Sequence, residues 1–321
     1  MKRLALLLLL IPIGLFLWLR GTPPSPMPLS SSDLGLMNMK AAACSYVATG
    51  TTKTLYRRKM VSMKFRFFHQ QPNKCRIEYL SYPLKGVVVG SDGKQVWRLD
   101  PAIGREVAME ASGCTDPESR LDLLAQNYRM ELTRGGRVAG FGTYTINVRD
   151  KSGRVQKRLQ VNRKAFIILQ SEDFSDGKLK AQSKFDTLKY VENPASLFEK
   201  PSGMMCTQGT GKTMSVGELS KAVGFLVKQP KYVPAGFKME GYRLYQCPCG
   251  CGHKSAYLRY TNGMSSISVF ETKKDSGCSM KGSCKAFGSC QMTTTSADGK
   301  SFIVIGDLDP KELSKIADSL H

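Results

Sequence analysis

The residues best suited to chemistry are cysteines gathered in the last third of the chain. Cys247, Cys249 and Cys251 alternate with Pro and Gly and lead to His253, so a potential ligand stands at every second position. Three more cysteines follow within 40 residues of His253. The candidate ligand set is Cys247, Cys249, Cys251, His253, Cys278, Cys284 and Cys290. Thiolates with an imidazole suit zinc, and several soft sulfurs also suit Cu(I).

Disulfide bonds are the competing interpretation of this cluster. In an oxidising compartment disulfides are the default, and the ten cysteines of the chain are an even number. The C-x-C spacing is also tighter than the C-x(2–4)-C of usual zinc sites. A disulfide framework, a zinc or copper site and redox-active thiols all stay open. Each of them places the segment from Cys247 to His253 in a loop between the Pro-Ala-Gly-Phe strand and the strand expected near Tyr257.

Other motifs give little support for catalysis. The segment Gln208-Gly-Thr-Gly-Lys-Thr213 ends like a phosphate-binding loop, but Cys206 stands where that pattern requires glycine. His69 follows a run of aromatic residues on an expected strand, where a histidine is usually structural. No Ser-His-Asp set or pair of carboxylates stands out. We therefore predict a binding protein rather than an enzyme.

The N-terminus indicates export. Lys2-Arg3 precedes an apolar run from Leu4 to Leu19, the pattern of a secretory signal. The run is slightly short for a membrane span, and no cleavage site follows it directly, so residues 1–22 are expected to be either a cleaved signal or a retained anchor. Residues 23–31 are rich in Pro and Ser and predict a flexible tether. The remaining chain is expected in the periplasm or cell envelope.

The charge of the chain narrows the class of partner. The formal net charge is +21. Export makes nucleic acid an unsuitable target, so an anionic lipid or glycolipid, a polyanionic wall polymer or an acidic protein surface fits better. The alternative is a generally basic surface with no specific partner.

Alternating apolar patterns divide the rest into two units. Residues 32–200 predict a helix near Ser32, many antiparallel strands, an internal helix after Thr115 and further strands. This order is typical of a strongly curved antiparallel sheet, a half-barrel around a helical plug. After a linker at 201–214, residues 215–321 predict a smaller α+β domain with a helix at each end and the Cys-rich loop inside it. The fold class is therefore α+β.

An open apolar concave face in the first unit would suit acyl chains. The candidate lipid-contacting residues are Met60, Met63, Phe65, Phe67, Val87, Val89, Val96 and Ile146. Methionine fits adaptable apolar sites. The competing interpretation for each of them is an ordinary, well-filled core.

Several motifs carry a resemblance to a known family. In the second unit they are Tyr232-Val-Pro-Ala-Gly-Phe237, Ala256-Tyr-Leu-Arg-Tyr-Thr-Asn-Gly263, Ser265-Ser-Ile-Ser-Val-Phe270 and Asp298-Gly-Lys-Ser-Phe-Ile-Val-Ile-Gly306. In the first unit they are Lys74-Cys-Arg-Ile-Glu-Tyr79, the segment from Gly90 to Pro101, Arg137-Val-Ala-Gly140 and Leu197-Phe198. This order resembles the MucB/RseB family, whose large domain has a LolA/LolB-like half-barrel. The Cys-rich loop is a departure from that family.

The resemblance implies an extracytoplasmic regulator. Its partner would be the extracytoplasmic segment of a membrane-spanning anti-sigma factor, which it shields from proteolysis. Its large domain would sense or hold a lipid or lipoprotein moiety that displaces the partner. Two alternatives stay open: a lipid or lipoprotein carrier built on the half-barrel alone, and a metal-binding or redox module on the same scaffold.

Overall fold

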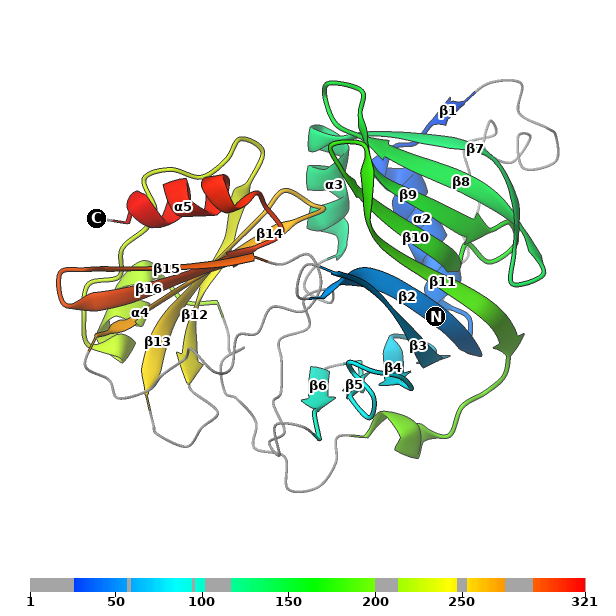
Figure 1. Cartoon of the computed structure of the whole chain (residues 1–321), viewed down its shortest axis with the longest axis horizontal. Coiled ribbons are helices and arrows are strands. Elements are labelled where there is room, and N and C mark those ends of the chain that lie inside the picture. The colour runs from blue at the N-terminus through cyan, green and yellow to red at the C-terminus, as the bar shows by residue number, and fades with distance from the viewer. Residues whose placement is uncertain are drawn as a thin grey trace, which may run out of the picture.

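The strands of the chain build two antiparallel sheets that lie side by side (Figure 1). The computed structural model describes residues 26–56, 59–93, 96–101, 117–199, 213–246, 253–274 and 291–320. Within these ranges one sheet has eleven strands and the other has five. We call the part from β1 to η2 the large lobe and the part from α4 to α5 the small lobe.

The elements follow one another in a simple order. The large lobe contains β1 (Met27–Pro28), α2 (Ser31–Ala42), β2 (Tyr46–Tyr56), β3 (Lys59–Gln70), β4 (Lys74–Tyr79), β5 (Val88–Ser91), β6 (Val96–Leu99), α3 (Pro117–Asn127), β7 (Arg129–Val138), β8 (Phe141–Arg149), β9 (Val155–Asn162), β10 (Ile168–Ser175), β11 (Lys178–Tyr190) and η2 (Ala195–Phe198). The small lobe contains α4 (Val216–Val223), β12 (Lys238–Gln246), β13 (Lys254–Thr261), β14 (Ser266–Lys273), β15 (Gln291–Ala297), β16 (Lys300–Gly306) and α5 (Pro310–Asp318).

Side-chain caps start the helices where the sequence predicts them. Ser30 accepts the backbone N–H of Asp33, whose carboxylate bonds back to the cap, and Ser215 makes the same reciprocal pair with Glu218. Asp309 caps α5 ahead of a proline in the first turn. The predicted start near Thr115 lies outside the described residues, and α3 is described from Pro117.

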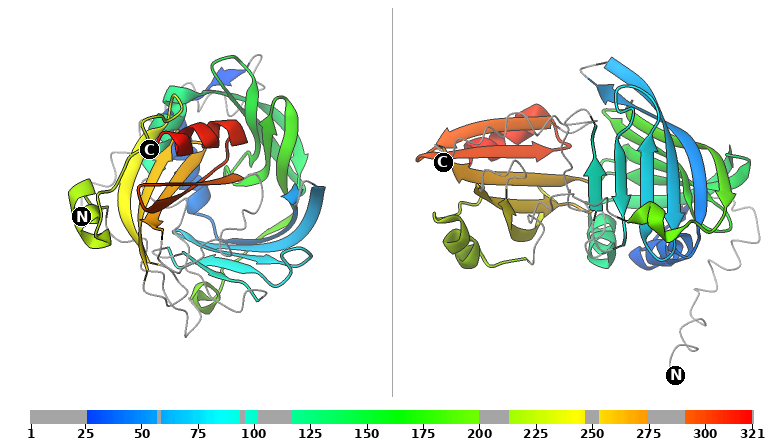
Figure 2. Two further views of the ribbon diagram at one scale, coloured as in Figure 1. Left: turned by 60° about the vertical axis from the view of Figure 1, so that its left-hand side comes forward. Right: turned by 90° about the horizontal axis from the view of Figure 1, so that it is seen from below.

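The large sheet is strongly curved and does not close on itself within the described residues. Its strand order is β1-β7-β8-β9-β10-β11-β2-β3-β4-β5-β6, so β1 and β6 are its two edges there. Figure 2 shows the bend of the sheet, with α2 on its inner side. The predicted α+β class with a curved antiparallel sheet and helical plug is confirmed.

The inner face of the large sheet can be followed by register. One row of paired residues crosses it from β7 to β3: Leu132, Ile146, Leu159, Ser171, Ser183, Thr52 and Met63. Residues that pair directly on antiparallel strands point to the same side of a sheet. Helix α2 packs against the β7–β8 end of this row through Leu34 and Met37. The row therefore marks the concave, core-facing side.

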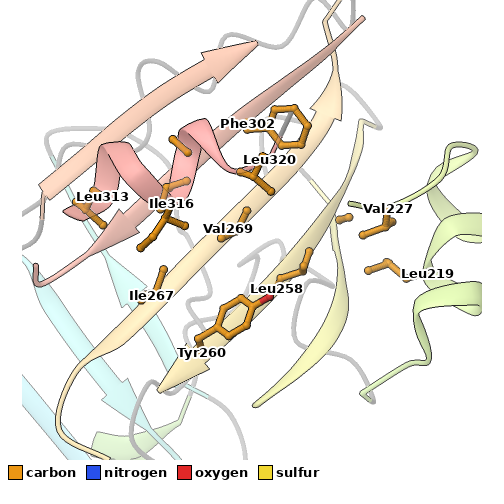
Figure 3. Packing of buried hydrophobic residues seen from close by; sticks show 13 residues of the cluster. Leu219, Val227, Leu258, Tyr260, Ile267, Val269, Phe302, Leu313, Ile316 and Leu320 are labelled. Carbon is orange, nitrogen blue, oxygen red and sulfur yellow. The ribbon is translucent and has the colours of Figure 1, made fainter. Parts of the chain in front are cut away.

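The small lobe is built around one apolar core (Figure 3). Leu219 of α4 and Leu313, Ile316 and Leu320 of the C-terminal segment meet Leu258 and neighbouring sheet residues there, and all are at most 1% exposed. Burial of such side chains contributes roughly 1.5–3 kcal/mol each. The two terminal helices thus hold one face of the five-stranded sheet.

Only part of the N-terminal segment lies within the described residues, which begin at residue 26. The apolar run from Leu4 to Leu19 lies outside the described residues. In the segment expected as a tether, Met27 and Pro28 pair with Leu132 and Glu131 of β7. Among the helices that the structure describes, none combines the length and apolar character needed to cross a membrane.

Candidate binding site

Three of the predicted lipid-contacting residues share the inner face of β3. Met63, Phe65 and Phe67 alternate along the strand and pair with Thr52, Gly50 and Ala48 of β2. Met63 is 4% exposed and Phe65 is 2% exposed. Gly50 leaves room for the Phe65 ring, since a Cβ at that position would lie 2.6 Å from the ring carbon Cζ. The side chains of Met63 and Phe65 are therefore part of the packed core.

Val87 and Val89 join Met63 in one apolar cluster. Val87 is buried, Val89 is partly buried, and Leu84 completes the contact. Val96 begins β6 and pairs with Ser91 of β5. Val96 lies in the described backbone, but its side chain is outside what the structure describes.

Ile146 belongs to a different cluster at the other end of the inner face. It packs with Leu132, Tyr144 and Met37 of α2, and is 3% exposed. Ile146 and Met63 therefore lie in separate clusters along the concave face, so the predicted set is not gathered in one hollow. Helix α2 covers the Ile146 end directly.

Met60 does not lie with the others. Side chains alternate across a strand, so Met60 points to the opposite, outer side from Met63 and Phe65. Its side chain is 48% exposed. The prediction that Met60 lines the concave face is wrong, because it stands three positions before Met63 rather than two or four.

A cleft with room for a ligand lies beside α2, at a place the sequence did not indicate. Its volume is about 830 Å³, within the range of small-molecule sites. It is lined by Ser31, Ser32, Gly35, Leu36, Asn38, Met39, Ala42, Ala43, Gln71, Pro72, Asn73, Leu121 and Asp122. These residues come from the outward side of α2, the β3–β4 turn and α3.

The lining of the cleft combines apolar and polar groups. Met39 is 65% exposed, which is unusual for such a side chain and marks α2 as incompletely covered. Leu36 and Leu121 extend the apolar surface, while Asn38 and Asn73 offer amide donors and acceptors. Such a mixture can hold a peptide segment or a lipid with a polar head.

His69 is a structural residue close to the end of the cleft. Burial lowers the pKa of its imidazole, although its Nδ1 lies 2.6 Å from the carbonyl oxygen of Cys44. Its ring stacks on Tyr46 at 5.2 Å between centroids. The contacts join β3 to the end of α2. They match the structural role predicted for this histidine.

The cysteine cluster lies almost entirely outside the described residues. This applies to Cys247, Cys249, Cys251, Cys278, Cys284 and Cys290. His253 stands just before β13, and its Nδ1 is buried without a hydrogen-bond partner. No three His, Cys, Asp or Glu side chains gather to hold a metal within the described part of the chain. Disulfides, zinc or copper, and redox-active thiols stay predictions.

Helix α3 connects the cleft to the small lobe through charge. Glu240 of β12 lies 3.3 Å from Arg120 Nε of α3 and 2.8 Å from Arg259 Nε of β13. The side chains of these three residues are 4–17% exposed. One carboxylate between two guanidinium groups in a largely dry contact holds α3 on the small lobe.

Backbone fit strengthens the same contact. Asn127, the last residue of α3, donates to the carbonyls of Gly236 at 2.9 Å and Asn262 at 3.1 Å. Gly263 has a φ of +91°, and a Cβ there would lie 2.4 Å from the backbone nitrogen of Leu124. Two loops of the small lobe therefore close around one helix of the large lobe.

Comparison with solved structures gives matches to the whole architecture. A crystal structure of MucB in complex with MucA(peri) aligns with a TM-score of 0.59 and 16% identity, covering 90% of this chain and 98% of that one. The complex structure of Pseudomonas aeruginosa MucA/MucB aligns with a TM-score of 0.58 and 16% identity, covering 89% and 96%. A crystal structure of MucB gives 0.58, 16%, 90% and 96%.

Comparison of sequences alone does not detect the similarity to MucB. No protein-family model and no curated protein matches the chain. The alignments nevertheless extend over both lobes and almost all of each MucB chain. The chain is similar in fold to MucB, as the motifs resembling the MucB/RseB family predict.

Proposed function

We propose that this chain is a non-enzymatic, extracytoplasmic regulatory protein that binds the extracytoplasmic segment of a membrane anti-sigma factor or a similar regulator. The observation that carries the proposal is the fold match to MucB over both lobes. One of the matched structures contains MucB in complex with MucA(peri). The motifs of the small lobe support the same family. The basic, export-type N-terminus supports the compartment.

The cleft beside α2 is our candidate for the ligand that controls this partner. A lipid or lipoprotein moiety could place an acyl chain along Leu36, Met39 and Leu121 and its polar part near Asn73. The cleft fits this role better than the inner face of β3, because Met63 and Phe65 are already buried. The lipid thus binds in the cleft beside α2 rather than on the concave face of the large sheet.

Helix α3 offers a route between the cleft and the partner. Leu121 and Asp122 line the cleft, while Arg120 and Asn127 of the same helix hold the small lobe. A ligand that shifts α3 therefore changes the small lobe's docking. The coupling is reciprocal, so partner and ligand weaken each other's binding by the same factor.

A cleft-filling substitution tests the proposal. Gly35 lies on the cleft side of α2, and a Cβ there meets nothing within 4 Å, so Gly35→Trp can occupy the space without backbone strain. Gly217→Trp in α4 is the matched control, since its added Cβ also meets nothing within 4 Å. Each protein would be crosslinked in its native membrane and its adducts identified by mass spectrometry.

The expected adduct is a membrane protein with an extracytoplasmic segment and a cytoplasmic sigma-binding domain. Gly35→Trp should lose co-purified lipid while keeping the protein adduct, and Gly217→Trp should keep both. Stoichiometric lipid with no protein adduct in the unsubstituted chain would instead identify a carrier. Bound metal or free thiols in periplasmic material, with neither lipid nor protein adduct, would favour the metal or redox module.

A further inference from the structure

A second surface of the large lobe carries an unusual excess of positive charge. It is the outer face of β11, β2 and β3, the side opposite to Met63 and the core. Its exposed cations are Lys53, Lys64, Arg66, Lys184 and Lys189. Lys64 and Lys184 both pair with Thr51, so they stand two strands, about 10 Å, apart. We call these five residues the basic face.

The basic face has almost no counter-charge. Asp186 is the one acidic residue in the sequences of these three strands, and its carboxylate accepts a hydrogen bond from Thr51. None of the five cations makes an ion pair with a described residue. They repel one another at this spacing, which makes an external anion favourable.

The other half of the same outer face is built differently. Across β7 to β10, Arg149 pairs with Glu131 at 2.9 Å, and Arg158 contacts Glu172 at 3.4 Å. These two arginines are thus neutralised within the sheet, whereas Arg129 on the same face is exposed and makes no ion pair with a described residue. Carboxylates therefore accompany some of the cations on this half, but on the basic face none of the five cations has one, which favours an external anion there.

Exposed apolar side chains accompany the unpaired cations. Met60 shares the outer side of β3 and is 48% exposed. Leu80 is 42% exposed, and its N–H bonds to the Lys64 carbonyl. Tyr82 in the same loop is 73% exposed. Cations beside protruding apolar and aromatic side chains are typical of surfaces that rest in the headgroup region of a bilayer.

We infer that the basic face docks this protein on an anionic lipid bilayer. The exposed apolar side chains beside the cations favour a bilayer over an acidic peptide, because such side chains suit the interface region of a membrane. The five cations meet headgroup phosphates, and Met60, Leu80 and Tyr82 enter the interface. This inference is independent of the proposed function, because the contact requires lipid alone and no regulatory partner.

Vesicle flotation tests the inference with the full chain. Vesicles of phosphatidylglycerol and phosphatidylcholine would be compared with phosphatidylcholine alone, at low and high salt. The apolar N-terminal run can bind both kinds of vesicle, so the measured quantity is the ratio of binding to anionic vesicles over binding to neutral vesicles.

The test variant is the triple change Lys64→Gln, Arg66→Gln, Lys184→Gln. The matched control is Lys221→Gln, Lys273→Gln, Lys311→Gln, which removes three exposed charges from the small lobe.

The test triple should lower this ratio about 100-fold, because each cation near an anionic membrane contributes about fivefold. The control triple should leave it close to the original. Asp186→Asn, which removes the only carboxylate of the three strands, should raise it several-fold. Equal losses in both triples, or no preference for anionic vesicles in the unsubstituted chain, would overturn the inference. Unchanged thermal unfolding of the variants confirms that the fold is intact.

Discussion

Asn127 and Gly236 join the two lobes through one short contact: the Asn127 side-chain amide donates to the Gly236 carbonyl at 2.9 Å. Gly236 has a φ of +87°, and a Cβ there would lie 2.6 Å from Asn127 Oδ1. The same amide nitrogen also donates to Asn262. The Pro-Ala-Gly-Phe and Asn-Gly motifs that resemble the MucB/RseB family therefore meet at a single side chain of α3.

Replacing Asn127 by Ala removes both bonds and leaves two loop carbonyls without their donor. A loss of this kind typically lowers the free energy of unfolding by about 1–3 kcal/mol. Denaturant unfolding measures the change, and Asn73→Ala on the exposed β3–β4 turn is the control. An Asn127 variant as stable as the Asn73 variant would show that the amide does not hold the lobes together.

Gly263 makes a sharper test of the same docking. Gly263→Ala places a Cβ 2.4 Å from the Leu124 backbone nitrogen, and the residue's φ of +91° adds strain. Gly299→Ala is a matched control, because Gly299 also has a positive φ but no atom within 4 Å of its Cβ position. Left-handed strain alone costs about 1–2 kcal/mol. The Gly263 variant should lose clearly more unfolding free energy than that.

Limited proteolysis separates this clash from a local hairpin effect. If α3 and the small lobe come apart in Gly263→Ala, cleavage between the lobes should accelerate while Gly299→Ala stays protected. Equal stability and equal cleavage of the two variants would mean that the hairpin at Gly263 does not seat against α3.

Glu240 is the electrostatic centre of the interface. Glu240→Gln removes the negative charge between Arg120 and Arg259, and breaking a buried ion pair by removing one partner typically costs about 3–5 kcal/mol. Glu312→Gln is the control, since it removes a carboxylate paired with exposed Lys315 and should change stability little. Calorimetry of both variants gives the comparison, and similar melting temperatures would argue against a working interlobe ion network.

Alternating patterns predict the strands and the fold class, because each strand keeps one side in the core. The same rule places Met63, Phe65 and Phe67 together. Applied strictly, it also excludes Met60, whose position has the opposite parity. An apolar, adaptable side chain alone does not place a residue on the concave face, because the register of the strand decides which side it takes.

Features assembled from distant segments could not be predicted in this way. The cleft joins α2, the β3–β4 turn and α3, which lie far apart in the sequence and meet only after the sheet has curved. The basic face has the same origin. Basic residues of β2, β3 and β11 are visible in the sequence, but only the strand pairing of Lys64, Thr51 and Lys184 puts them on one outer surface.

His69 predicts how stability depends on pH. Burial lowers its pKa below the ordinary value of 6.5. The unfolded chain therefore binds a proton at a higher pH than the folded chain does. The free energy of unfolding therefore contains a contribution from neutral His69 that is complete above about pH 6.5 and is lost as the pH falls toward the folded pKa.

His69→Gln removes the imidazole that titrates. Denaturant unfolding between about pH 5 and pH 8 should show a smaller decrease in stability toward acid for the variant. Identical slopes for the two proteins would mean that the imidazole next to Tyr46 and the Cys44 carbonyl can be protonated in place.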